Sequence, residues 1–101
     1  MIYLNAHLRT RPGDHPELMK AAMAMIAATR QEAGCIRYDL HVSVTDPQSM
    51  VFVEEWKDRA ALEAHFTAPH MAVWRKASEG YFTDRRIDII HPEKVETLKG
   101  C

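Results

Sequence analysis

Two histidines, His65 and His70, lie five residues apart in the stretch LEAHFTAPHM. Imidazole gains and loses a proton near neutral pH, so both side chains could act as acid/base groups. They could also bind a metal, or they could serve the joint between two helices, His70 as a cap and His65 by bonding a backbone carbonyl. On residue chemistry alone, the structural role is the stronger interpretation.

The spacing of these histidines argues against a metal site. A zinc-binding pair on one helix needs an i, i+4 spacing, and Pro69 interrupts the helical pattern between them. No third ligand follows nearby in the sequence. The four glycines form no phosphate-binding loop, and Cys35 matches no nucleophile motif. We therefore expect no cofactor and no metal, and we expect Cys35 and Cys101 to be free thiols.

Glu54 is a carboxylate in an apolar setting, because it alternates with Phe52 and Trp56 along an expected strand. A carboxylate on such a face needs a partner, for example a histidine or an arginine. Glu54 could therefore contribute to the chemistry of the histidines or form a structural ion pair. Asn5, on the first expected strand, could line the same cavity or lie at a wet edge.

Hydropathy periodicity predicts the elements that position these residues. Alternating or continuous apolar residues predict four strands, at residues 2–10, 36–44, 49–56 and 85–91. Apolar residues at helical spacing predict a long helix over 15–33, with a capping box formed by Asp14 and Glu17. Asp58 and Thr67 are expected to cap two shorter helices, which Pro69 keeps apart.

The order β-α-β-β-α-β predicts a split βαβ, ferredoxin-like α+β fold, with an antiparallel four-stranded sheet and helices on one face. Residues 1–92 are expected to form this domain, and residues 93–101 a polar C-terminal tail. The strand near residues 50–53 is apolar on both faces. We therefore expect a second copy of the chain to cover the open sheet face, which gives a homodimer.

The overall composition excludes several functional classes. The chain has 101 residues, 47% of them hydrophobic and 27% charged, with a formal net charge of −1. This is one ordinary globular domain without a basic field, so no nucleic acid is expected as a partner. No signal-like leader and no long apolar run is apparent, so we expect a cytoplasmic protein that does not contact membranes.

Three segments, LRTRPGDHPEL, EAGCIRYDL and VFVEEWKDRAALEAHFTAPHM, resemble the antibiotic biosynthesis monooxygenase family. Within that family they are most similar to the small bacterial quinol monooxygenases. The resemblance implies a dimeric α+β barrel. It also implies oxidation of a quinol or polyphenolic small molecule by molecular oxygen, without metal, haem or flavin.

The resemblance also suggests roles for individual residues. His65 becomes the candidate base, with His70 and Glu54 as its orienting or ion-pairing partners. The expected substrate pocket draws on five further side chains, those of Asn5, Tyr38, Trp56, Phe66 and Trp74. Two alternatives stay open. A related branch of isomerases, which act on a phosphorylated autoinducer-2-like molecule, shares the glutamate and histidine pattern. A non-catalytic dimeric protein that binds small molecules is an interpretation from another functional class.

Overall fold

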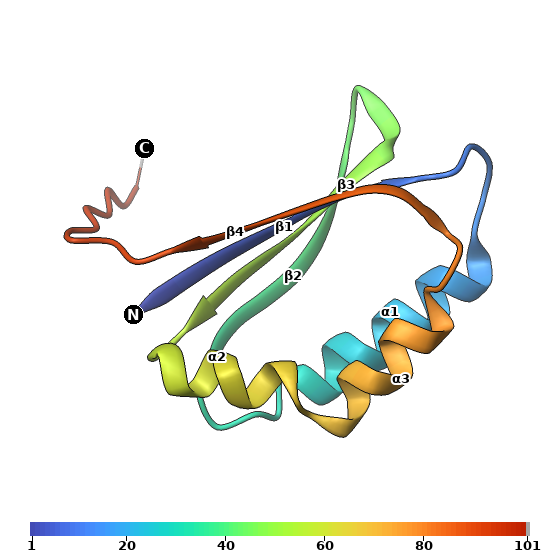
Figure 1. Cartoon of the computed structure of the whole chain (residues 1–101). Helices are drawn as coiled ribbons and strands as arrows, with labels where there is room; N and C mark the ends of the chain where they lie inside the picture. Colours follow the sequence, from blue (N-terminus) through green and yellow to red (C-terminus); the bar gives the residue numbers. More distant parts are fainter. Residues whose placement is uncertain (101) are drawn as a thin grey trace.

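The computed structural model describes residues 1–100; Cys101, predicted to be a free thiol, lies outside them. The chain forms four strands and three helices (Figure 1). Their bounds, in chain order, are β1 (Ile2–Thr10), α1 (Pro16–Thr29), β2 (Cys35–Ser43), β3 (Asp46–Trp56), α2 (Arg59–Phe66), α3 (Pro69–Ala77) and β4 (Phe82–Ile90).

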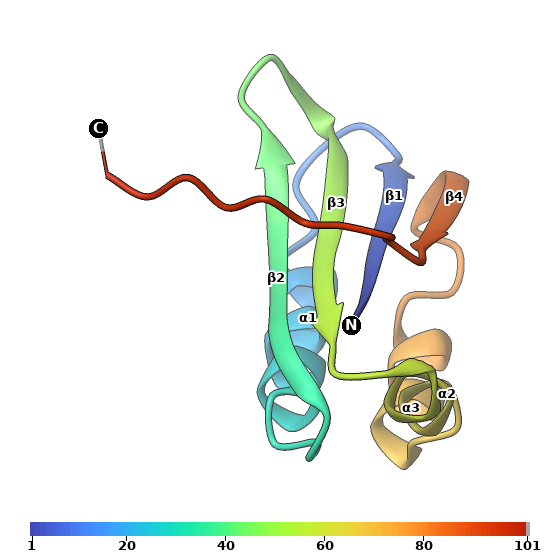
Figure 2. The same cartoon turned by 90° about the vertical axis from the view of Figure 1, so that its left-hand side faces the viewer.

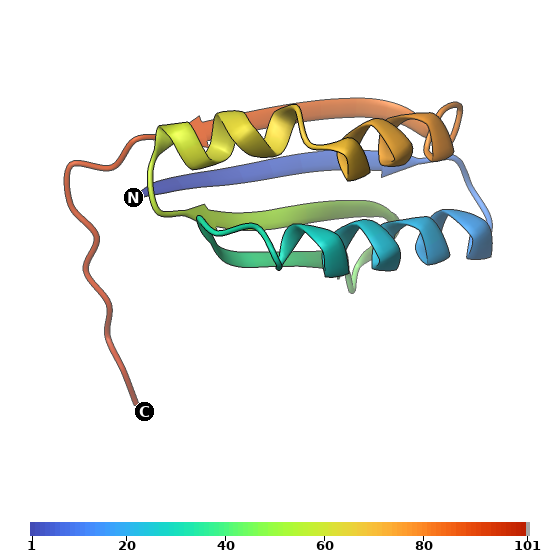
Figure 3. The ribbon, with the colours of Figure 1, turned by 90° about the horizontal axis from the view of Figure 1, so that it is seen from below.

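The strands form a single sheet in the order β2-β3-β1-β4, and every neighbouring pair is antiparallel. All three helices lie on one face of the sheet, α1 along the β2–β3 side and α2 and α3 along the β1–β4 side (Figure 3). The predicted ferredoxin-like α+β arrangement is therefore confirmed.

Side-chain alternation along the two central strands builds the core between sheet and helices. On β1 the buried side chains that face the helices include Leu4, Ala6 and Leu8, and their partners on β3 include Phe52 and Glu54. The face of α1 that packs against them carries Leu18, Ala22 and Met25. Glu54 is thus a carboxylate inside an apolar core layer.

The opposite sheet face is left uncovered by the helices (Figure 2). It carries Val51 and Val53, which are half-buried, beside polar side chains such as Asn5 and His7. The homodimer expected on this face stays a prediction.

The long helix is shorter than predicted. It ends at Thr29 rather than near residue 33, because the amides of Gln31 and Glu32 bond to carbonyls only three residues back and form turns. Its start also differs from the prediction, since His15 occupies the N-cap position and no side chain caps the helix.

The two short helices follow the predicted break at Pro69. The Asp58 carboxylate accepts a hydrogen bond from the amide of Ala61 at 2.8 Å, as predicted for a cap. Thr67 instead follows the end of α2, and its hydroxyl donates a hydrogen bond to the carbonyl of Ala64. Ala68 occupies the N-cap position of α3, which begins at Pro69. Residues 91–100 form no helix or strand, and no helix within residues 1–100 is long and apolar enough to cross a membrane.

Candidate active site

The turn that follows α1 places Glu32 against the joint between α2 and α3. Backbone bonds from Glu32 to Thr29 and from Cys35 to Glu32 fix the turn, and the amide of Lys57 bonds to the carbonyl of Gly34. From this turn the Oε2 atom of Glu32 lies 2.8 Å from the Nδ1 of His65 and 2.8 Å from the Nε2 of His70. One carboxylate oxygen thus contacts both histidines.

This contact fixes the proton positions on both rings. A carboxylate accepts hydrogen bonds only, so Nδ1 of His65 and Nε2 of His70 are the nitrogens that carry hydrogen. In its neutral form His65 therefore has its lone pair on Nε2, the atom not bonded to Glu32. This is the tautomer that can accept a proton from a bound molecule.

Aromatic rings hold His65 in place from behind. The His65 ring centroid lies 4.7 Å from that of Trp56 and 5.3 Å from that of Tyr38, and both aromatic side chains are buried. His65 itself is 1% exposed. This burial lowers the pKa of His65 below its usual 6.5, and the Glu32 carboxylate opposes the shift only in part. His65 is therefore neutral at neutral pH.

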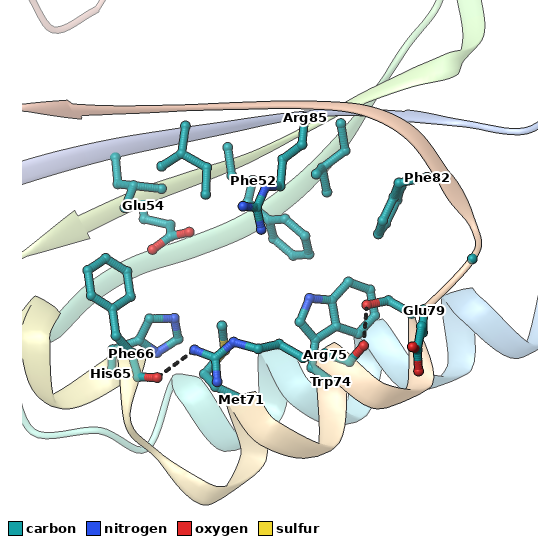
Figure 4. A pocket seen from close by; sticks show the side chains of 16 residues that line it. Phe52, Glu54, His65, Phe66, Met71, Trp74, Arg75, Glu79, Phe82 and Arg85 are labelled. Atoms are coloured by element: carbon teal, nitrogen blue, oxygen red, sulfur yellow. Dashed lines mark hydrogen bonds between the residues drawn. The ribbon is translucent and has the colours of Figure 1, made fainter.

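A cavity of about 510 Å³ opens beside His65, between the sheet and the α2–α3 layer (Figure 4). Its apolar lining comes from both layers and includes Leu4, Ala6, Phe52, Met71, Trp74 and Phe82. Within residues 1–100, no buried side-chain nitrogen or oxygen lacks a partner, and no hydrogen bond to the Nε2 of His65 is present. Nε2 must therefore reach open space, and His65 lines this cavity.

Glu54 lines the same cavity from β3, above His65 in Figure 4. It is 4% exposed, and its Oε1 accepts a hydrogen bond from the Nε1 of Trp56 at 3.0 Å. Burial raises the pKa of Glu54 to about 7, the Glu32 charge adds to the rise, and the Trp56 bond opposes it. The carboxyl group is therefore poised between its protonated and ionised forms near neutral pH.

The predicted site residues separate into three groups. His65, Glu54, Phe66 and Trp74 all line the cavity. Outside the cavity lining, His70 bonds to Glu32, Tyr38 packs against His65, and Trp56 donates a hydrogen bond to Glu54. Asn5 lies on the other face of β1, because Leu4 and Ala6 on either side of it face the cavity.

The expected partner of the histidines was Glu54, but the structure places Glu32 in that position. Glu32 was not among the predicted site residues, because it falls within the helix predicted over 15–33, where a glutamate is expected to face solvent. Arg75 and Arg85 also line the cavity and had not been predicted. The sequence does contain a signal for Arg85. It lies on the same face of β4 as Ile87 and Ile89, so a charged residue interrupts a row of apolar residues.

The two histidines and Glu32 also present donor atoms of a kind that binds metals. Their three ligand atoms all lie within 4.8 Å of one another. A pair of imidazoles with one carboxylate suits zinc or iron(II). The sequence near the two histidines offers no third metal ligand, but Glu32 provides one from a distant part of the chain. Activity therefore has to be measured with and without a chelator.

Comparison with known proteins defines the class. The sequence model of the Antibiotic biosynthesis monooxygenase family matches residues 1–77, and the chain belongs to this family. It is 31% identical to the Escherichia coli protein named "Probable quinol monooxygenase YgiN", over 91% of this chain and 98% of that one.

Solved structures agree with this assignment. PA3566 from Pseudomonas aeruginosa superposes with a TM-score of 0.81 at 31% identity, covering 92% of this chain and 94% of that chain. Rv0793 from Mycobacterium tuberculosis superposes with a TM-score of 0.84 at 28% identity, covering 95% and 98% of the two chains.

Proposed function

We propose that this protein is a cofactor-independent monooxygenase that oxidises a quinol or polyphenolic aromatic molecule with O2. The observation that carries the proposal is the buried His65, whose Nδ1 is paired with Glu32 and which lines a largely apolar cavity. Membership of the monooxygenase family and the name of the Escherichia coli relative support the reaction class. The assignment of His65 as the base is our own inference from the geometry.

The proposed reaction begins with a proton transfer. Nε2 of His65 accepts the proton of a substrate hydroxyl, and Glu32 stabilises the imidazolium through Nδ1. The resulting electron-rich quinolate transfers an electron to O2, and recombination forms a carbon–oxygen bond and a substrate hydroperoxide. An aromatic substrate packed against the apolar part of the lining would displace water from this step.

The second half of the reaction breaks the O–O bond. One oxygen atom stays on the ring as a new carbonyl or hydroxyl, and the other leaves as water with the ring hydrogen and the proton returned by His65. A quinol and O2 thus give a hydroxyquinone and water, with all four electrons supplied by the substrate. Protonated Glu54 is placed to donate a hydrogen bond to the peroxide, because its carboxyl group lines the same cavity.

The proposal also includes a homodimer through the uncovered sheet face, where Val51 and Val53 lie among polar side chains. Light scattering after size exclusion tests this directly. We expect twice the chain mass at micromolar concentration, and a monodisperse monomer would contradict the dimer.

Oxygen consumption is the measurement that tests the function. Metal-stripped protein is given reduced quinols and anthrones in the presence of a chelator, and uptake is measured above autoxidation. We expect uptake that His65→Asn abolishes, because asparagine retains a donor toward Glu32 but has no basic nitrogen. His91→Gln, an exposed histidine after β4, is the matched control and should keep full activity.

Three outcomes would contradict the proposal. Uptake that appears only after a metal is added would assign Glu32, His65 and His70 to a metal centre. Turnover of a phosphorylated substrate without oxygen consumption would indicate an isomerase. Tight binding of aromatic ligands without any turnover, in both wild type and variant, would indicate a binding protein.

A further inference from the structure

Two arginines face the cavity from opposite layers. Arg75 lies on α3 and Arg85 on β4, and both line the space beside His65 (Figure 4). Within residues 1–100, neither guanidinium forms an ion pair with a carboxylate. Arg75 donates one hydrogen bond to the carbonyl of Phe66, so its other N–H groups and those of Arg85 are available to a ligand.

A bound aromatic molecule would change the surroundings of these cations. Both side chains are exposed to solvent, and most of the remaining lining is apolar. A neutral ligand that fills the cavity removes water from two guanidinium groups and returns no partner, which is unfavourable. An anionic substituent instead accepts charge-assisted, bidentate hydrogen bonds from them.

The acidic groups of the cavity limit the charge of that substituent. Glu54 lies near His65 and contributes a negative charge only when it is ionised, and the exposed Glu79 lies beyond Trp74 as seen from the two guanidinium groups in Figure 4. Two cations are therefore partly balanced by carboxyl groups. This balance favours one negative charge, as in a carboxylate, over the two of a phosphate ester.

We propose that the substrate is a hydroxyaromatic carboxylate, whose carboxylate is held by Arg75 and Arg85 while its hydroxyl-bearing ring faces His65 and Glu54. The part of this proposal in which the hydroxyl-bearing ring reacts at His65 rests on the proposed function. The anion site, formed by Arg75 and Arg85, does not rest on it, because it concerns binding alone.

Titration calorimetry with ligands that cannot be oxygenated tests the anion site. The probes are naphthalene-2-carboxylate, its neutral isostere naphthalene-2-carboxamide, and 2-naphthyl phosphate. We expect the carboxylate to bind about tenfold more tightly than the carboxamide, as charge-assisted hydrogen bonds imply. Arg85→Gln should abolish this preference, and Arg85→Lys should restore part of it.

The neighbouring arginine on the same strand provides the matched control. Arg86 points to the other sheet face, where it pairs with Asp88 at 3.3 Å, so Arg86→Gln removes the same charge without touching the cavity. It should keep the preference for the carboxylate. Thermal unfolding of each variant establishes that it is folded.

Four results would overturn the proposal: equal affinity for carboxylate and carboxamide, no detectable binding of the carboxylate, an equal loss in Arg86→Gln and Arg85→Gln, or tighter binding of the phosphate. The last would point to a phosphorylated substrate. Oxygen uptake without an anion preference would refute the anion site alone, and an anion preference without oxygen uptake would refute the proposed function alone.

Discussion

The Oε2 atom of Glu32 lies 2.8 Å from the Nδ1 of His65, although 33 positions separate the two residues. The carboxylate comes from the turn after α1, and the imidazole from the end of α2. Since the same oxygen also contacts His70, the pair is held by three segments of the chain. A carboxylate that fixes the tautomer of an imidazole and stabilises its cation is a recurring way to make a histidine an efficient base.

The first prediction concerns Glu32 as a positioning residue. Glu32→Gln removes the negative charge that stabilises the His65 imidazolium. The new amide can also donate a hydrogen bond to Nδ1 of His65 instead of accepting one, so the tautomer of His65 is no longer fixed. We expect kcat for oxygen uptake to fall by about 100-fold, at the lower end of the roughly 10²–10⁴-fold that a positioned acid–base group contributes. The acid limb of the pH profile should move to lower pH, because the lost charge lowers the pKa of His65 further.

Glu63→Gln is the control for this variant. Glu63 is exposed and pairs with Arg59 on the surface of α2, so the same change in charge occurs away from the cavity. Its kcat and pH profile should match those of the wild type. A Glu32→Gln variant with reduced stability but an unchanged profile would assign Glu32 a purely structural role.

The pH dependence of kcat/KM is the second prediction. His65 acts in its neutral form, and burial lowers its pKa below the usual 6.5, so the acid-side loss of activity should lie at a pH below that of an ordinary histidine. Glu54 acts as a proton-bearing donor with a pKa of about 7, so activity should also fall as the pH rises through 7. Glu54→Gln should lose the alkaline limb only. A rate that rises through pH 7 would instead make Glu54 a base.

The third prediction concerns stability. Because burial raises the pKa of Glu54 from 4.5 to about 7, the folded protein binds this proton more tightly than the unfolded chain does. The associated stability is complete below pH 4.5 and is lost as the pH rises through 7. In a Glu54→Gln variant, the amide side chain still accepts the Trp56 hydrogen bond but does not ionise.

Urea unfolding at two pH values measures this effect. Between pH 5 and 8, the free energy of unfolding of Glu54→Gln should gain about 2 kcal/mol relative to the wild type. Glu55→Gln, on the opposite face of the same strand, should show no comparable gain. An equal pH dependence in Glu54→Gln and the wild type would show that Glu54 does not carry this linkage.

The sequence predicts the fold well because strand alternation and helix periodicity are local signals. Leu4, Ala6 and Leu8 alternate with polar residues, and Pro69 marks the break between α2 and α3. The ends of elements depend on contacts that a local pattern does not contain. The last predicted turn of α1 is replaced by tighter turns, and Gly34 meets α2 there.

The site was harder to predict for the same reason. His65, Glu54 and Trp74 could be proposed from residue type and resemblance, but the partner of His65 is brought in by a turn whose geometry depends on tertiary packing. The resemblance places Asn5 in the cavity, yet strand alternation puts it on the other face of β1 from Leu4 and Ala6.

The last prediction tests how the turn positions Glu32. A Cβ atom added to Gly34 would lie 2.2 Å from the Cβ of Ala61, far closer than van der Waals contact allows. Gly34→Ala must therefore push the turn away from α2. We expect a loss of stability of about 1–3 kcal/mol, typical of overpacking, measured by urea unfolding. Since Glu32 lies two residues earlier, kcat should fall as well.

The double variant Gly34→Ala with Ala61→Gly separates this steric effect from a loss of backbone freedom. Ala61→Gly alone should cost about 1 kcal/mol, because glycine is unfavourable within a helix. If the clash is the cause, the double variant should be more stable than the sum of the two single changes predicts, and much of its kcat should return. Simple additivity would show that Gly34 does not position the turn by its close approach to Ala61.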